Sequence, residues 1–448
     1  MGLLTLPQSL PSAATTSNNA TYSGAYVGGS VSFADALTAA DAEWRVGVDL
    51  LASDEATALE AGGLYDLTTA DRMLPGSATV TLDTTQATLR TLSLALRTSD
   101  GRYLPGASGY PSGGAGSPTA TGLTWFDVRY RPWLDLATGF NADGSRRWTR
   151  TTLGIFVLTQ PQMQVQAPGA VAQLTLADKS ALLQKPYRLT AANLPTYTAS
   201  GGHTAGGYAA GTAVDTAMSD LAQRAGIPAA RIHFEPTTTT LPGDYAVAEG
   251  DEPWTHLRTL AATLGHVLYF DRDGNLVRRA NPLSVNTPPV WAFTPGPLCT
   301  VAALTRSTDF SNTFNHIIVC GGSSATALVR GEATVTDASS PYHANALGDR
   351  VAFWGQNGLG DMTPDPTIGS VAAAQSQAQL LLAQHLGQQE TIQLQGRTLP
   401  TLAPYDRITV DVPQAGLATD AQLTQLTIPL ATNGAMTLTA AKWLQVGS

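Results

Sequence analysis

The sequence predicts a β-rich α+β protein made of a β unit, a small α+β unit and a second β unit that carries an insertion. Apolar and polar residues alternate near both ends of the chain, whereas two central segments carry apolar residues at helical spacing. Only 13% of the 448 residues are charged and 43 are glycine, a composition typical of turn-rich β structure. A chain of this length exceeds the size of a single core, so several domains are expected.

The first β unit is predicted over residues 41–200. The segments WRVGVDLL and SATVTLDTTQATLRTLSLALRT alternate as strands do, and Asp143-Gly144 is a hairpin signal between two later strands. A glycine- and proline-rich surface loop is expected at 105–122, and a flexible arm at 1–40. The residues predicted to face inward are Val80, Leu82, Leu92, Leu94 and Leu96.

The α+β unit is predicted over residues 201–295 and contains two helices. The first is expected to be capped by Thr212 and to end at Gly226. The second is expected to be capped by Asp251, with Glu252 and Pro253 in its first turn, and to end at Gly265. The apolar stripes are Val214, Met218, Leu221, Ala222 and Ala225 in the first helix, and Trp254, Leu257, Leu260, Ala261 and Leu264 in the second.

The second β unit is predicted over residues 296–448, with a loop and helix insertion at about 330–388. The span 330–370 is polar and is expected to be loop-like, and SVAAAQSQAQLLLAQHLGQQ is expected to be a helix with Leu380, Leu381 and Leu386 facing the core. Strands are expected again in ETIQLQGRTL, YDRITVDV, DAQLTQLTIPL and AMTLTAAKW.

The sequence DRDG, from Asp271 to Gly274, is predicted to be a hairpin turn. A calcium loop of the EF-hand type needs glycine at its sixth position and glutamate at its twelfth, whereas here Gly274 is fourth and Pro282 is twelfth. A hairpin needs only a turn-forming Asp-Gly between two strands, and HVLYF and NLVRR flank it.

No constellation for catalysis or metal binding is predicted. Asp251 and Glu252 are adjacent acids whose position at a helix start is explained by capping and by the helix dipole. Nucleophile-elbow, P-loop and dinucleotide-binding motifs do not occur in the sequence. No two histidines have the spacing of a zinc-binding helix; they are His203, His233, His256, His266, His316, His343 and His385.

The two cysteines are placed opposite each other if the chain turns between Asp309 and Phe310. Cys299 and Cys320 then face each other across two neighbouring strands, and reduced, buried thiols are favoured for a protein made in the cytosol. A Cys320–His316 nucleophile is disfavoured, because residues four apart on a strand are roughly 13 Å apart.

The charge of the chain argues against tight binding to nucleic acid. The net charge is -9, whereas a phosphate-binding surface needs clustered Lys and Arg. The amino terminus lacks the pattern of a secretory signal, and no apolar run is long enough to span a membrane. Synthesis in the cytosol is therefore expected.

Several segments, taken in order, resemble tail hub proteins of bacteriophages and related contractile injection machines. GDEPWTHLRTLAATLGHVLYFDRDGNLVRRANP is similar to a helix that opens with an acidic-Pro-Trp turn and leads into a hairpin in that family. FSNTFNHIIVCGG, SSPYHANALGDRVAFWGQNGLGD, AAAQSQAQLLLAQHLGQQETIQLQGRTLPTLAPYDRITVDV and TIPLATNGAMTLTAAKW are similar to later family segments, and ATLRTLSLALRTSDGRYLP and TTLGIFVLTQPQMQVQAPGAVAQLTLADKSALL to its first barrel. Tyr405 departs from the pattern, which has glycine before Asp406.

The resemblance implies two β-barrel, tube-like domains that flank the small α+β domain, with the insertion in the second barrel. It further implies a homotrimer whose six barrels form a pseudo-hexameric ring around a channel. The function implied is that of a structural, non-enzymatic virion protein, a hub at the distal tip of a phage tail after assembly in the host cytoplasm. Its partners would be the distal tail or tail tube protein, the tape measure protein and a tail fibre or spike protein, with DNA only in transit and no cofactor.

Two other functions are weighed against the hub. A tail-associated cell-wall hydrolase would use acids such as Asp251 or Asp271. A carbohydrate-binding adhesin would expose aromatic platforms, for which the candidates are Trp133, Trp148, Trp291 and Trp354.

Overall fold

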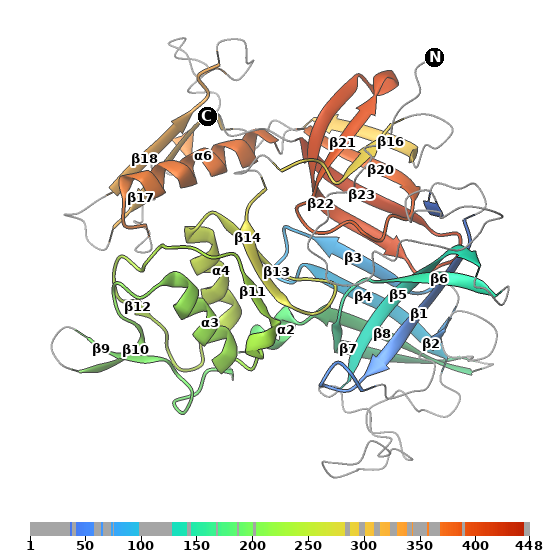
Figure 1. The fold of residues 1–448 in the computed structure, drawn as a ribbon, viewed down its shortest axis with the longest axis horizontal. Coiled ribbons are helices and arrows are strands. Elements are labelled where there is room, and N and C mark those ends of the chain that lie inside the picture. The colour runs from blue at the N-terminus through green and yellow to red at the C-terminus, as the bar shows by residue number, and fades with distance from the viewer. Residues whose placement is uncertain are drawn as a thin grey trace.

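The structure of the chain is a computed structural model. It describes residues 36–37, 42–57, 64–65, 73–74, 76–97, 128–140, 145–166, 169–185, 188–199, 203–282, 287–294, 301–308, 314–322, 329–337, 343, 356–357, 368–387 and 390–442. The predicted arm apart from residues 36–37, the 105–122 loop, Cys299 and Trp354 lie outside these residues. The described part is a β-rich α+β structure with one large, mostly antiparallel sheet (Figure 1).

The first group of strands comes from the amino-terminal third of the chain. The predicted alternation is confirmed, because Val80, Leu82, Leu92, Leu94 and Leu96 are all buried. The strands flanking Asp143-Gly144 pair with each other as expected, although the turn itself lies outside the described residues. The strands are β1 (Trp44–Leu51), β2 (Leu64–Tyr65), β3 (Thr79–Asp83), β4 (Arg90–Arg97), β5 (Arg129–Phe140), β6 (Arg146–Thr152), β7 (Phe156–Gln166) and β8 (Gly169–Asp178).

The second group of strands comes from the carboxy-terminal third and joins the first in one sheet of 14 strands. Its members are β15 (Trp291–Phe293), β16 (Val301–Thr308), β20 (Glu390–Arg397), β21 (Arg407–Val412), β22 (Leu417–Pro429) and β23 (Ala435–Lys442), with a short 3-10 helix η3 (Pro413–Ala415). The junction is the antiparallel pair β22–β3, from Gln425 opposite Asp83 to Pro429 opposite Thr79. One apolar core runs through both groups, from Val46 to Ala440.

The continuous sheet qualifies the expectation of two separate barrels. The strand order is β16-β20-β23-β22-β3-β4-β8-β7-β5-β1-β2, with β15, β21 and β6 attached at the side. The two β groups therefore share backbone hydrogen bonds and a core, and Figure 1 shows them stacked in one body with the blue and red strands meeting at β3 and β22.

The central segment folds into a helical unit beside the sheet. Helices α3 (Val214–Arg224) and α4 (Pro253–Thr263) bury the predicted stripes in a core that includes Met218, Leu221, Trp254 and Leu257. Gly226 and Gly265 follow the helices with φ of 96° and 66°, a conformation natural to glycine. The other elements are α2 (Ser180–Leu183), β9 (Thr196–Thr198), β10 (Thr204–Tyr208), η2 (Ala229–Arg231), β11 (Ile232–Phe234), β12 (Tyr245–Ala246), β13 (His266–Phe270) and β14 (Leu276–Ala280).

Both predicted helix caps are wrong. The residues that precede the helices are Ala213 and Glu252, and neither makes a side-chain capping hydrogen bond. Thr212 instead accepts the backbone N–H of Leu241 at 2.8 Å, as part of a short bridge that holds the entry to α3 extended. Asp251 accepts the backbone N–H of Ala248 at 2.7 Å and lies 3.0 Å from His256 Nε2, so its carboxylate does not cap the first turn of α4.

The insertion forms a separate small layer with its own core. Helix α6 (Val371–Gly387) packs on β17 (His316–Gly321) and β18 (Val329–Thr334), and β19 (Gln356–Asn357) pairs with β17. The helix confirms the prediction, whereas β18 corrects the loop expected from residue 330 onward. Leu382 is buried in the core of this layer, Leu381 and Leu386 pack against that core, and Leu380 is buried on the side of the helical unit.

The predicted cysteine hairpin is also wrong. β16 pairs with β20 in the large sheet, whereas Cys320 lies on β17, which pairs with β18 and β19. β16 and β17 therefore belong to two different sheets and do not form a hairpin with each other, and Asp309 and Phe310 lie outside the described residues. Among the described helices, none is long and apolar enough to cross a membrane.

Candidate functional site

The DRDG sequence is a hairpin turn, as predicted. β13 and β14 pair antiparallel from His266 opposite Ala280 to Phe270 opposite Leu276. One oxygen of the Asp271 carboxylate accepts the backbone N–H groups of Asp273 (2.9 Å) and Asn275 (2.8 Å), and the other accepts the Asn275 amide at 2.9 Å. Gly274 takes a φ of 78°. The carboxylate of Asp271 therefore stabilises the turn through these hydrogen bonds.

The DRDG turn also docks the helical unit onto the first group of strands. The backbone oxygen of Gly274 accepts Lys179 Nζ at 2.9 Å. Lys179 in turn pairs with Glu55 at 2.6 Å, and both side chains are less than a tenth exposed. Arg231 lies 3.3 Å from the second oxygen of Glu55, so two cations share one buried carboxylate at this junction.

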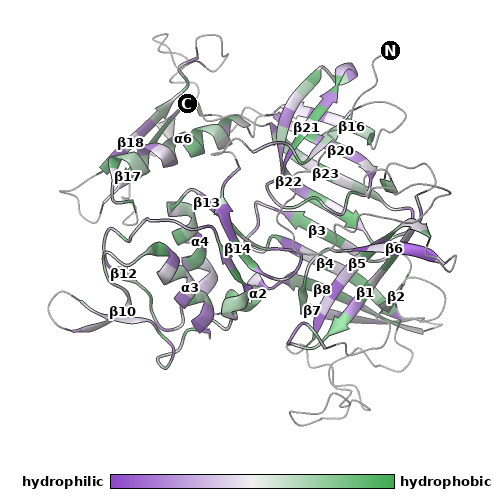
Figure 2. Ribbon diagram, viewed as in Figure 1, coloured by the Kyte–Doolittle hydropathy of each residue, from purple (hydrophilic) through white to green (hydrophobic). Residues whose placement is uncertain are grey.

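The same hairpin also contacts the segment that connects β20 to β21 in the second group of strands. Arg272 donates to the carbonyl of Thr401 at 2.6 Å, and Arg279 donates to the carbonyl of Pro404 at 2.9 Å. Arg279 also lies 3.5 Å from Asp406, whose pKa is raised by burial. The carboxy-terminal end of strand β14, which carries Arg279, is hydrophilic in Figure 2, whereas its beginning is apolar. The hairpin therefore contacts both β groups and fixes the helical unit against them.

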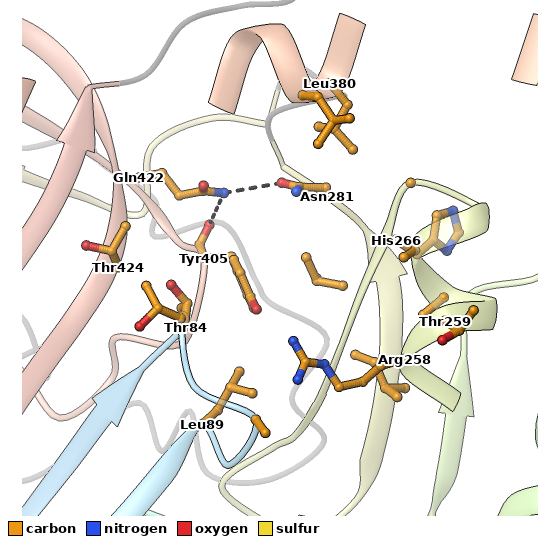
Figure 3. Close-up of a pocket in the computed structure, with 18 of the residues that line it drawn as sticks. Thr84, Leu89, Arg258, Thr259, His266, Asn281, Leu380, Tyr405, Gln422 and Thr424 are labelled. Atoms are coloured by element: carbon orange, nitrogen blue, oxygen red, sulfur yellow. Dashed lines mark hydrogen bonds between the residues drawn. The ribbon is translucent and has the colours of Figure 1, made fainter. Parts of the chain in front are cut away.

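A crevice of about 770 Å³ opens where the helical unit, α6 and the β groups meet (Figure 3). The amide of Gln422 bridges it, donating to Asn281 Oδ1 at 3.3 Å and to the carbonyl of Tyr405 at 3.4 Å. Of the described residues that line it, Glu252 is the one carboxylate, and the bases are Arg258, His266 and Lys442. The described lining of this crevice therefore lacks the second carboxylate that hydrolysis of a glycosidic bond by a pair of acids requires.

Tyr405 lines the crevice in a backbone conformation that glycine would take without strain. Its φ is 64°, which matches the sequence observation that the resembling family has glycine at this position. Its ring packs with Leu89, Val267 and Tyr269, and burial raises the pKa of its hydroxyl to about 12. Packing of the ring thus offsets the cost of a left-handed backbone.

The acid considered for hydrolysis, Asp251, is in a setting that suits a structural role. It accepts Ala248 N–H, and it is 3.0 Å from His256 Nε2, while His256 Nδ1 is 3.0 Å from the hydroxyl of Tyr245. The hydrogen bond from Ala248 and that from His256 hold the pKa of Asp251 below its usual range. A general acid needs the opposite shift.

The remaining candidate residues are dispersed. His316 pairs with Glu332 at 3.1 Å and lies on the same strand as Cys320, four residues away. No group of three His, Cys, Asp or Glu side chains within the described ranges could hold a metal ion.

The described tryptophans among the candidates for a sugar-binding platform do not form one exposed aromatic surface. Trp133 is 2% exposed, and its indole N–H donates to Asp49 at 2.9 Å. Trp148 is covered by the guanidinium of Arg45 at 3.9 Å, and Trp291 is half-buried. These rings therefore pack within the sheet.

Comparison with known proteins gives a match in fold alone. No family model and no curated protein matches the sequence. The structure is similar to the tail protein from Neisseria meningitidis MC58, at 14% identity and a TM-score of 0.53, over 89% of this chain and 96% of that chain. The fold is that of phage tail proteins. The 43 kDa tail protein of prophage MuSo2 from Shewanella oneidensis is similar too, at 11% identity and a TM-score of 0.52, over 90% of this chain and 98% of that chain.

The tail-protein fold confirms the resemblance stated from the sequence. The Glu55–Lys179 pair was not predicted, because no local pattern links two residues that are 124 positions apart by their residue numbers. The one local signal for the docking hairpin was the pair of adjacent arginines in the strand after the turn. Because successive side chains of a strand point to opposite faces, the two arginines need hydrogen-bond acceptors on both faces.

Proposed function

We propose that this chain is the hub at the distal tip of a phage tail. The observation that carries the proposal is the match in fold, along nine tenths of the chain, with two solved tail proteins. The proposed hub is a homotrimer that joins the tail tube or distal tail ring, with the tape measure protein, to the fibre or spike proteins. DNA passes through its channel, and the function is structural, without a reaction or a cofactor.

We also propose a division into domains at 41–200, 201–295 and 296–448, with the insertion at about 330–388, and a barrel in each outer domain. Separate cores in the helical unit and in the insertion support this division. The hydrogen-bonded junction of β22 with β3 supports two barrels that move as one body.

The edge strand β16 supports closure of the ring by copies of the same chain. It pairs with β20 on one side, and six of its eight residues are exposed. An open edge of this kind templates the addition of another strand unless charges guard it. Here Arg306 is the one charged residue of the strand, and it is held by Glu390 at 2.5 Å.

The oligomeric state and shape test the proposal directly. Light scattering after size-exclusion chromatography is expected to give three subunits of 46.6 kDa each, and electron micrographs a three-fold ring with a central hole. A stable monomer, or a compact particle without a hole, contradicts the hub.

A matched pair of lysine variants tests the edge. Thr305→Lys places a charge on β16 and is expected to shift the trimer toward monomer, whereas Gln395→Lys places the same charge on exposed surface of the doubly paired strand β20 and leaves the trimer intact. Equal assembly of both variants would exclude β16 from the contact.

The absence of catalysis is tested with purified peptidoglycan. We expect no release of soluble fragments by the wild type. If the wild type releases soluble fragments and the Asp251→Ala variant does not, the hydrolase function is supported and the structural hub function is contradicted.

The net charge of -9 supports a channel that does not retain DNA, since like charge disfavours contact with phosphate. A basic channel wall in the assembled ring would contradict this part of the proposal.

A further inference from the structure

A second, much smaller cavity, partly open, lies where the two β groups meet the DRDG hairpin. Its volume is about 20 Å³, which is room for about one water-sized particle. The polar residues that line it are Arg90, Arg272 and Thr152. The remaining wall is apolar and comes from Val80, Leu82, Leu153, Pro400, Leu402, Leu426 and Ile428.

Arg90 is one of the most buried charged side chains in the described structure. It is 4% exposed, and its Nη1 is buried without a hydrogen-bond partner among the described residues. The carboxylate of Asp178, at the end of the neighbouring strand β8, accepts the backbone N–H of Arg90 at 3.0 Å and the backbone N–H and hydroxyl of Ser180. A buried charge that is left uncompensated destabilises a fold by several kcal/mol.

Arg272 brings a second positive charge to the same cavity. Burial lowers the pKa of Arg90, and the charge of Arg272 lowers it further, ahead of the opposing effects of Asp178 and Asp271. Arg272 donates to the neutral carbonyl of Thr401, and Asp271 is engaged by the turn. The lining thus carries an excess of positive charge within an apolar wall.

We propose that this cavity is a binding site for one small monovalent anion, of the size of chloride or bromide, held between the guanidinium groups of Arg90 and Arg272. The site selects by size, because a volume that admits one water-sized particle has no room for phosphate, sulfate or an organic carboxylate. The anion links β4 to the DRDG hairpin. This inference is independent of the proposed hub function.

The test compares salts at equal ionic strength. Thermal unfolding in sodium chloride or bromide is expected at a midpoint roughly 2 °C or more above that in sodium gluconate, with saturation as the halide concentration rises. A crystal soaked in bromide is expected to show an anomalous peak between Arg90 and Arg272. Equal midpoints in all three salts, or a water molecule alone in the cavity, would overturn the proposal.

Two arginine variants separate the site from general effects of charge. Arg90→Met removes the charge at similar length and is expected to abolish the dependence on halide. Arg278→Met is the control, because Arg278 is also fully buried but has a carboxylate partner, Asp215, at 2.7 Å. It should lower stability and keep the halide dependence. If Arg90→Met does not fold, the bromide peak in the wild type decides, and Arg90→Met that still responds to halide refutes the site.

Discussion

Replacing Gly274 by alanine probes the docking of the DRDG turn. The φ of 78° costs a residue with a Cβ roughly 1 kcal/mol. The added Cβ would also lie 2.9 Å from Ile155 Cγ1 and 3.2 Å from an oxygen of Glu55, so the neighbouring β group has to move. Overpacking of this kind costs about 1 to 3 kcal/mol. We therefore expect Gly274→Ala to lower the free energy of unfolding by about 3 kcal/mol.

Gly211→Ala is the matched control for backbone strain. Gly211 has a φ of 81°, and nothing lies within 4 Å of an added Cβ. Its expected cost is about 1 kcal/mol, from the backbone alone. Equilibrium unfolding in urea, followed by tryptophan fluorescence, gives both values. If the two variants lose the same stability, the turn is not pressed against Ile155 and Glu55, and the docking role assigned to the hairpin is refuted.

Three further changes have defined outcomes. Tyr405→Gly removes the strain of a left-handed backbone but also removes a ring that packs on Tyr269. We expect the free energy of unfolding in urea to fall by about 2 kcal/mol, and an increase would contradict the packing argument. Burial lowers the pKa of His266, and the charge of Arg278 lowers it further. The contribution of neutral His266 to folding stability is therefore complete above pH about 6.5 and is lost as the pH falls below that value. His266→Gln should flatten this pH dependence of the melting temperature. Asp49→Ala leaves the indole of Trp133 without its acceptor and should cost about 3 kcal/mol, whereas an unchanged melting temperature would show that water replaces the carboxylate.

The periodicity of apolar residues over short segments was enough to predict single helices, strands and the hairpin turn. The stripes of α3 and α4 and the alternation of β3 and β4 repeat within a few residues, so periodicity was enough to find them. The DRDG turn was found for the same reason, because its ladder is closed by neighbouring residues.

Pairings between distant segments were not predictable in the same way. β16 pairs with β20, whose partner residues lie more than 80 positions away, and the local assumption of a hairpin to β17 failed there. Caps failed at Thr212 because tertiary pairing with Leu241 outweighed the local preference. The crevice and the Arg90 cavity are each lined by several chain segments that are distant in sequence, so no single segment predicts them.

The pairing of β3 with β22 has a consequence for how the protein is made. Asp83 and Gln425 are 342 positions apart, so at about 5 to 20 residues per second β3 leaves the ribosome roughly 20 to 70 s before its partner exists. During that interval one side of β3 is an open strand edge, to which a second nascent chain can add. Completion of the last strands during translation is therefore the event that seals the amino-terminal half, and chains that terminate early are the ones expected to aggregate.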